Sequence, residues 1–404
     1  MQIAVIGAGI IGQTIALRLG QAGYAVTLIA PEVEPHMAST GNAGTIADYA
    51  VEPVGTPEVL RDTPRLLFDP LSPLALHRGS LAPLAPWLAR FLRQSLPAAA
   101  QRNRAALAPL VHDAATGWTA LAESVGGQDL FQHRGALYLY DSAAAMDGAR
   151  AMQARRQALG VDVELLDQAA LEALEPGLPR GRFTGAARFA TTLWMTDPAR
   201  MLDKIAAAAR ASRITARVTS LTQAGAGWRV TLDSGAVLDA SRVVVAAGAW
   251  SARLLRPLGV RIPLISERGY HLEFDLPLAD QPVTRPTCPV AQGFYFTPMD
   301  GRLRAAGTVE LGRADAPASP HRWDVLERNA RAIFPDLPPV SRRWMGNRPS
   351  LPDSLPVVGT ARPGLLLAFG HGHIGLTLAP RTADMILRAL DGGDLPPAVS
   401  PHRF

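Results

Sequence analysis

Cysteine is almost absent from this chain of 404 residues, in which Cys288 is the only one. A disulfide within the chain and a zinc or iron–sulfur site built on several cysteines are therefore excluded, and we expect a reducing compartment. Long apolar runs are missing too, since no stretch approaches the ~18 consecutive apolar residues of a membrane span. The apolar start MQIAVIGAGIIG has no basic segment ahead of it, so we interpret it as mature protein and not as a signal peptide. We expect a cytoplasmic protein, in which any membrane contact is peripheral and on the inner face.

The chain also has little net charge, because 40 basic residues stand against 35 acidic ones, a formal balance of +5. The basic residues form short pairs without neighbouring aromatic side chains on which bases could stack, so we expect no nucleic-acid partner. The mild positive charge could attract anionic substrates or an anionic membrane surface, and solvated helix faces are the alternative explanation. A composition of 48% hydrophobic and 19% charged residues fits a compact α/β enzyme.

The N-terminal pattern predicts a βαβ unit. Residues 2–6 form a short apolar run, apolar residues recur at helical spacing from Ile11 to Leu19, and residues 25–29 form a second run. A chain of this length exceeds the ~150 residues of one domain, so we predict at least two domains. Prolines at 70, 73, 83 and 86 predict an extended linker between Asp69 and Trp87, and a domain boundary within it.

Helical and strand patterns alternate along the rest of the chain. Ala- and Leu-rich sequence predicts helices over 87–125 and a further helical stretch before Gly160. Helices are also predicted at 199–211, 322–334 and 376–390, and Asp167 is the expected N-cap of another. Short β-rich runs predict strands at 135–140, 161–166, 217–221, 228–232, 242–247 and 365–369, and residues 262–310 are dominated by strands.

A glycine motif follows the first predicted strand. The sequence Gly7-Ala8-Gly9-Ile10-Ile11-Gly12 is a GxGxxG at the point where a strand ends and a helix begins. In such a motif the first glycine permits a tight turn, the second admits a pyrophosphate, and the third lets helix and strand pack closely, while the helix N-terminus attracts negative charge. The motif therefore predicts a dinucleotide site at Gly7, Gly9, Ile10, Ile11 and Gly12.

The acidic residue that usually ends the second strand is missing. Leu28 and Ile29 are followed by Ala30, where an Asp or Glu would accept hydrogen bonds from a ribose. Glu32 could replace it if the turn curls back, and a solvated Glu32 is the alternative. The absence does not separate NAD from FAD.

Three further glycine-rich segments, Ala38–Gly44, Val243–Ser251 and Gly370–Thr377, are more than a simple nicotinamide dehydrogenase needs. Together with the N-terminal motif they resemble the D-amino-acid oxidase superfamily of FAD-dependent enzymes, and in particular its branch of D-amino-acid and D-hydroxyproline dehydrogenases. The resemblance spans nearly the whole chain. It implies a mixed α/β fold in which an FAD-binding Rossmann-like domain is interleaved with an antiparallel-sheet substrate domain. The predicted FAD-binding parts are 1–80, 190–250 and 343–404, and the substrate-binding parts are 81–189 and 251–342.

The resemblance also implies where FAD lies. The first glycine-rich segment follows the pyrophosphate to the flavin ring, the second ends near the adenine half, and the third places backbone amides against the pyrimidine edge of the flavin. The residues that it assigns to the cofactor are Thr40, Gly41, Asn42, Ala43, Gly44, Thr45, Val218, Ala247, Gly248, Trp250, Gly372, His373, Ile374, Gly375, Leu376 and Thr377. Neither His36 nor Cys288 stands in a recognisable attachment motif, so we expect noncovalent FAD.

The substrate site is predicted from a segment near the C-terminus. The sequence from Asn347 to Gly359 resembles the family's RPxxPDxxPxxG stretch, in which the arginine grips the substrate carboxylate. A guanidinium matches a carboxylate with two parallel hydrogen bonds, so Arg348 is the predicted anchor, with a structural role in its own loop as the alternative. Tyr270 or His271 could line the same pocket, and strand alternation predicts that only one does. His373 is predicted to serve the flavin and not a metal, because no second ligand lies at metal-binding spacing.

These expectations combine into one function. The chain is predicted to oxidise a D-amino acid, with D-proline or hydroxy-D-proline as examples, to its imine by hydride transfer to flavin N5. A quinone or a similar acceptor would then take the electrons, and no strong catalytic base is required. Two alternatives are open, namely a sarcosine- or glycine-oxidase-like enzyme that uses oxygen, and a flavin-binding subunit without catalysis. The substrate, its stereochemistry, the acceptor and the oligomeric state are not fixed by the sequence.

Overall fold

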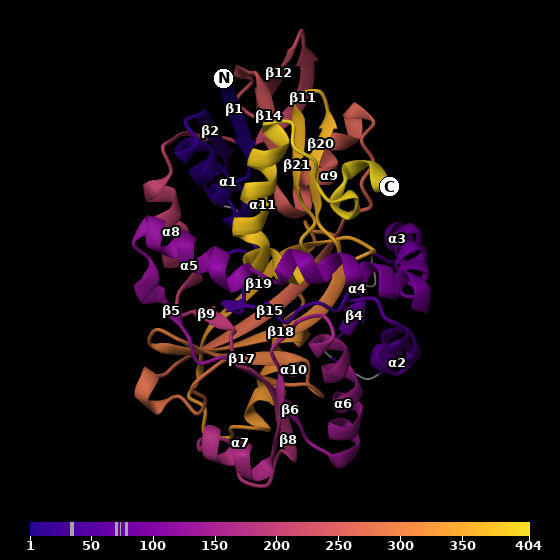
Figure 1. The fold of residues 1–404 in the computed structure, drawn as a ribbon, viewed down its shortest axis with the longest axis vertical. Helices are drawn as coiled ribbons and strands as arrows, with labels where there is room; N and C mark the ends of the chain where they lie inside the picture. Colours follow the sequence, from indigo (N-terminus) through magenta and orange to yellow (C-terminus); the bar gives the residue numbers. More distant parts are fainter. Residues whose placement is uncertain (33–35, 69–71, 73, 77–79) are drawn as a thin grey trace.

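Two β-sheets divide the molecule, and the chain passes between them several times (Figure 1). The computed structural model describes residues 1–32, 36–68, 72, 74–76 and 80–404. The upper half in Figure 1 holds a six-stranded sheet with helices packed against it, and the lower half holds a nine-stranded sheet. This arrangement confirms the predicted mixed α/β fold with an interleaved antiparallel-sheet domain.

The six-stranded sheet has the strand order β10-β2-β1-β14-β21-β20 and is parallel except for β20. Its strands alternate apolar side chains between two cores. Ile3 and Val5 pack in one core with helix α1 (Ile10–Gln21) and helix α11 (Gly375–Leu390), whereas Ala4 and Ile6 pack in the other. The strands are β1 (Gln2–Ile6), β2 (Ala25–Ala30), β10 (Ala211–Thr215), β14 (Arg242–Val245), β20 (Val357–Arg362) and β21 (Leu365–Phe369). The second core is shared with a small sheet of β11 (Val218–Ala224), β12 (Gly227–Leu232) and β13 (Val237–Ala240).

The nine-stranded sheet is mostly antiparallel, and one of its faces packs against helix α10 (Pro320–Arg331). Along its order the strands are β19 (Val340–Ser350), β15 (Ile265–Asp275), β18 (Arg302–Gly312), β17 (Phe294–Met299), β16 (Thr287–Pro289), β6 (Ala136–Tyr140), β8 (Gly185–Phe189) and β7 (Glu164–Asp167), with β4 (Leu74–Leu76) beside β18. A second three-stranded sheet joins β3 (Thr45–Ile46), β9 (Leu193–Met195) and β5 (Phe131–Gln132). Further helices are α2 (Pro57–Phe68), α6 (Ala143–Gln157), α7 (Gln168–Leu174), α8 (Pro198–Ala208) and α9 (Ser251–Leu255).

The predicted linker is partly wrong. Helix α3 begins at Leu81 and ends at Gln94, so it includes two of the prolines that predicted an extended chain. Pro83 lies in the first turn, where an amide has no acceptor within the helix, and Pro86 removes only the bond to that same turn. The other two prolines of the predicted linker, Pro70 and Pro73, lie outside the described residues.

The predicted domain boundaries need correction at three places. Strand β19 contains the start of the segment 343–404 but pairs with β15, so residues up to Ser350 belong to the nine-stranded sheet. Strand β4, inside the segment 1–80, pairs with β18 of that sheet as well. Helices α4 (Pro97–Val111) and α5 (Ala114–Val125) cross the middle of the molecule in Figure 1 and pack on α11, because their apolar faces share its cores.

Candidate functional site

A cavity of about 690 Å³ opens along the carboxyl edge of the six-stranded sheet and reaches the nine-stranded sheet. Cofactor cavities occur at this edge in open α/β sheets, where the strand order reverses, and their volumes are typically about 300–1,000 Å³. The ends of β1, β2 and β14 border one part of the cavity, and residues of β15, β17 and β19 border the other. One continuous space therefore joins the glycine turn to the predicted substrate residues.

The glycine turn has the geometry that its motif predicts. Gly7 has a φ of +107°, and a Cβ there would lie 2.4 Å from the carbonyl oxygen of Ala246. A Cβ at Gly12 would lie 1.8 Å from the carbonyl oxygen of Gly7, so only glycine permits this contact between helix and turn. Gly9 is the N-cap of α1 without a side-chain cap, and the first turn contains no acidic residue. No carboxylate of the first turn therefore competes with an anion at the helix N-terminus.

Four of the five predicted motif residues line the cavity, and Gly12 does not. Its role is packing, as the motif predicts for the third glycine. The amide of Ile10 donates to Oγ of Ser39 at 2.9 Å, a contact that the sequence did not suggest. This bond fixes the glycine-rich segment Ala38–Gly44 against the start of α1.

The far end of the cavity lies beside the end of β2, where the ribose acid is missing. Glu32 lines the cavity there, as does Val218, so both predicted residues are within reach of a bound molecule. Two basic residues at this end were missed, Arg213 and Arg217. They come from β10 and its following turn, because β10 pairs with β2 and places Thr215 opposite Ala30.

The segment from Ser39 to Gly44 is fixed by its own hydrogen bonds. The side-chain amide of Asn42 donates to the carbonyl of Ser39 at 2.6 Å, and the amide of Gly44 donates to Oδ1 of Asn42 at 2.7 Å. Residues from Thr40 to Thr45 all line the cavity. A Cβ at Gly41 would lie 2.2 Å from the indole of Trp344, so the chain presses directly on this ring.

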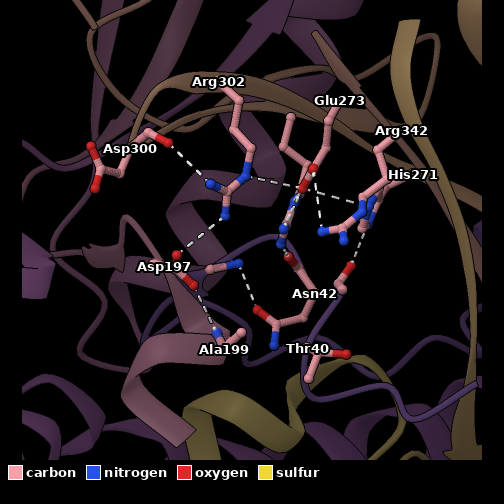
Figure 2. Close-up of polar contacts among 12 residues, drawn as sticks. Thr40, Asn42, Asp197, Ala199, His271, Glu273, Asp300, Arg302 and Arg342 are labelled. Atoms are coloured by element: carbon pink, nitrogen blue, oxygen red, sulfur yellow. Dashed lines mark hydrogen bonds and ion pairs between the residues drawn. The ribbon is translucent and has the colours of Figure 1, made fainter. Parts of the chain in front are cut away.

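A buried charged cluster holds the same segment from the side of the nine-stranded sheet (Figure 2). Nη1 of Arg304 donates to the carbonyl of Asn42 at 2.6 Å, and Nδ1 of His271 donates to the carbonyl of Gly41 at 2.9 Å. Glu273, which is 2% exposed, accepts from Nε of Arg304 at 3.0 Å and from Nε of Arg302 at 3.2 Å. One buried carboxylate thus orients the arginine that carries the bond to the segment.

His271 lies inside this cluster and not in the cavity, which corrects the prediction that made it a candidate for the pocket. Its ring stacks on Trp344 with 4.9 Å between the ring centroids. Burial lowers the pKa of His271 well below its usual range, and Arg304 acts in the same direction, so the ring is neutral. Tyr270, which precedes His271 in the chain, lines the cavity instead. Its hydroxyl donates to Glu310 at 2.6 Å.

The C-terminal glycine-rich segment meets the cavity in the short helix η6 (Gly372–Ile374) and the first turn of α11. Gly372, His373, Gly375 and Leu376 line the cavity, whereas Ile374 and Thr377 do not. Ile374 is a core residue at 2% exposure. The hydroxyl of Thr377 accepts a hydrogen bond from the amide of Ala47 at 2.9 Å. Neither residue borders the cavity itself: Ile374 packs in the core, and Thr377 holds the segment around Ala47 by a hydrogen bond.

Arg348 borders the other end of the cavity. Its Nη1 lies 3.1 Å from Oε1 of Glu267, its register partner on β15. A Cβ at Gly269 would lie 2.4 Å from Nη2 of Arg348, so the guanidinium lies directly over this glycine. Burial lowers the pKa of His373 nearby, and Arg348 lowers it further while Glu267 opposes the shift. The predicted anchor is thus presented to the cavity in one fixed orientation.

Tyrosines form the wall of the cavity near this end. Tyr49 and Tyr295 line it, and their hydroxyls are 3.0 Å apart. The hydroxyl of Tyr295 donates to that of Tyr138 at 3.0 Å, and burial raises the pKa of all three phenols. Tyr295 belongs to β17, whereas Tyr49 comes from a distant segment and had no sequence signal.

The residues present fit FAD. The open N-terminus of α1 suits a pyrophosphate, the apolar walls beside β2 suit an adenine, and the glycine turns leave backbone amides along the cavity. Cys288 is buried and does not line the cavity, and Nδ1 of His36 lies 3.3 Å from the carbonyl of Met345.

In the described ranges, His, Cys, Asp and Glu do not gather into a group that could hold a metal ion. None of the described helices combines the length and the apolar character that crossing a bilayer requires.

Comparisons with known proteins agree with the geometry. The family model described as FAD-dependent oxidoreductase (DAO) matches residues 2–389. The chain is 33% identical to the D-amino-acid oxidase of Bradyrhizobium diazoefficiens, over 100% of the chain and 98% of that protein. It is 30% identical to the D-amino acid dehydrogenase of Rhodopseudomonas palustris, over 94% of the chain and 91% of that protein. The crystal structure of glycine oxidase from Geobacillus kaustophilus superimposes with a TM-score of 0.78 at 22% identity, covering 100% of the chain and 98% of the oxidase. The chain therefore belongs to the DAO family of FAD-dependent oxidoreductases, and it is an enzyme whose cofactor is FAD.

Proposed function

We propose that this enzyme oxidises a D-amino acid to the corresponding imine and passes the electrons to a quinone or a similar acceptor. The observation that carries the proposal is the position of Arg348, whose guanidinium borders the same cavity as the glycine turn. The names of the two relatives, a D-amino-acid oxidase and a D-amino acid dehydrogenase, support the substrate class. D-Proline and hydroxy-D-proline are the first substrates to test.

FAD, when bound, supplies the acceptor for the two electrons and the proton that leave the substrate Cα. The protein's own part is binding and orientation. Arg348 binds the carboxylate and so fixes the direction of the Cα–H bond. Tyr49, Tyr270 and Tyr295 form walls that keep water from the reacting carbon. His373 remains neutral beside Arg348, so it does not compete with the guanidinium for the carboxylate.

The cofactor is proposed to be held without a covalent bond, by the glycine turn, the segment 39–45 and the first turn of α11. Denaturation in acid followed by filtration checks this, because noncovalent FAD passes through the filter and covalent flavin stays with the protein. A quinone acceptor would be met at a membrane surface, so peripheral contact with the inner face remains part of the proposal.

The test uses the purified holoenzyme without oxygen. We expect the visible flavin absorbance to bleach with D-amino acids, including D-proline and hydroxy-D-proline, and not with their L-enantiomers. Replacing Arg348→Lys keeps the charge but removes the fork of the guanidinium, so the substrate concentration for half-maximal bleaching should rise about tenfold or more, with unchanged FAD content. Failure of every small amine to bleach the flavin would overturn the proposal.

The acceptor is tested on the reduced protein. Fast reoxidation by an artificial quinone and slow reoxidation by oxygen are expected for a dehydrogenase. Fast reoxidation by oxygen and slow reoxidation by the quinone would favour the oxidase alternative. The likeness of the fold to that of a glycine oxidase is the reason to test it.

A further inference from the structure

Glu267 is a buried carboxylate at the substrate end of the cavity for which the proposed reaction has no use. It is 6% exposed, and it lines the cavity together with Arg348. Strands β15 and β19 are antiparallel neighbours in which Glu267 stands opposite Arg348, so the two side chains lie on one face of the sheet. The hydroxyl of Ser350 donates to Oε2 of Glu267 at 2.9 Å, which leaves Oε1 toward Arg348 at 3.1 Å.

The charges at this end of the cavity nearly cancel. The side chain of Arg348 is 24% exposed and that of Glu267 is 8% exposed, so neither charge is screened fully by solvent. His373 adds no charge, because burial lowers its pKa and Arg348 does the same. His371 adds none either, since its ring is buried and burial lowers its pKa to about 3.

A neutral pair of this kind discriminates between two classes of ligand. A simple carboxylate is attracted by Arg348 but repelled by Glu267 a few ångströms away, and both interactions are strengthened by low exposure. A zwitterion places its carboxylate on the arginine and its ammonium on the glutamate, so both interactions become favourable. In an amino acid the ammonium lies one carbon from the carboxylate, which matches a site whose opposite charges are 3.1 Å apart.

We propose that Glu267 is the second half of a zwitterion site, in which Arg348 binds the carboxylate of the amino acid and Glu267 binds its ammonium and accepts a proton from it. This inference rests on the proposed function. An N–H bond of the ammonium breaks, its proton forms an O–H bond with the Glu267 carboxylate, and its electron pair stays on nitrogen. That pair then forms the C=N bond as the Cα–H bond breaks and its two electrons leave with the hydrogen to FAD. Glu267 finally returns the proton to solvent.

The test compares two ligands that cannot be oxidised under these conditions and that differ by one group. 2-Aminoisobutyrate carries an ammonium and a carboxylate but no Cα–H, and isobutyrate has the same shape without the amine. Their dissociation constants are measured on the holoenzyme by the perturbation of its flavin spectrum and by calorimetry. We expect the wild-type enzyme to bind 2-aminoisobutyrate at least tenfold more tightly, because a hydrogen bond to a charged group contributes about 1.5–3 kcal/mol.

Glu267→Gln should move the two ligands in opposite directions. The neutral amide removes the repulsion, so isobutyrate binds more tightly, and it removes the partner of the ammonium, so 2-aminoisobutyrate binds about tenfold more weakly. Glu175→Gln is the matched control. Glu175 is likewise a buried carboxylate bonded to an arginine, Arg285, but it does not line the cavity, so the preference should be unchanged.

Four results would overturn the inference. If Glu267→Gln weakens both ligands, the glutamate only positions Arg348. If it changes neither, the carboxylate does not face the ligand. If the wild-type enzyme prefers isobutyrate, the ammonium has no partner, a conclusion that does not require the variant to fold. If the wild-type enzyme binds neither ligand although substrate bleaches its flavin, the zwitterion site is wrong while the proposed function stands, and failure in both assays removes both.

Discussion

Replacing Gly269→Ala should displace the guanidinium of Arg348 and leave the fold nearly intact. The new Cβ would lie 2.4 Å from Nη2 and 2.5 Å from Cζ of Arg348. Contacts between such atoms are favourable near ~3.5 Å, so the guanidinium must move by about 1 Å. Gly269 has no positive φ, so an alanine is not strained at this position, and the atoms it meets belong to the end of a flexible side chain.

A displacement of this size is costly for catalysis and cheap for folding. Misplacing a binding group by about 1 Å can lower the rate about 100-fold, and one hydrogen bond to a charged group contributes about 1.5–3 kcal/mol. We therefore expect kcat/KM for the best D-amino acid to fall about 10- to 100-fold, while FAD content and the midpoint of thermal unfolding change little. Steady-state kinetics with an artificial quinone, flavin absorbance and calorimetry measure the three quantities.

Gly148→Ala is the matched control, because a Cβ there meets nothing within 4 Å and the residue lies inside α6. It should raise the free energy of unfolding by about 0.5–1 kcal/mol and leave kcat/KM unchanged. Two results together would refute the argument from the guanidinium's position. Gly269→Ala would have the kinetics of the wild-type enzyme, and Arg348→Lys would have lost affinity for the substrate. Loss of FAD in Gly269→Ala would show instead that the change spreads through the sheet.

Three further perturbations test other parts of the structure. Gly12→Ala places a Cβ 1.8 Å from the carbonyl oxygen of Gly7, so we expect a loss of about 1–3 kcal/mol in stability and little retained FAD, measured by thermal unfolding and flavin absorbance. Glu273→Gln leaves the buried guanidinium of Arg304 without its carboxylate, and should lower the free energy of unfolding in urea by about 3–5 kcal/mol and weaken FAD binding. Burial lowers the pKa of His371 to about 3, below the ~6.5 of an unfolded chain, so the unfolded state takes up the proton and stability falls as the pH decreases below about 6.5. Between pH 6.5 and 5 the free energy of unfolding should fall by about 2 kcal/mol because of His371. Urea unfolding should show that this part of the pH dependence is absent from His371→Gln.

The parts of the fold that depend on local pattern were predictable. The strand at 365–369 has the bounds that its apolar run predicts, and the glycine turn needs only the three glycines of one short motif to be recognised. The helix α3 was not predictable in this way, because prolines are tolerated in a helix in its first turn or where, as at Pro86, they remove a bond to that turn.

The parts of the site that depend on sheet order were not predictable. Arg213 and Arg217 reach the ribose end because β10 lies next to β2, two strands separated by most of the first half of the chain. The pairing of Glu267 with Arg348 depends on the register of β15 with β19, which the sequence pattern does not give.

The bonds from Arg304 and His271 to the segment that contains Gly41 and Asn42 have a thermodynamic consequence. That segment borders the cofactor cavity, whereas both donors belong to the nine-stranded sheet. A ligand that binds only the native state stabilises it in proportion to the logarithm of its concentration, and every element bonded to the binding segment shares that gain. Cofactor loading therefore acts as a coupling between the two sheets. Holoenzyme should melt in one transition whose midpoint rises with free FAD, and its substrate sheet should lose protection from hydrogen exchange when FAD is removed.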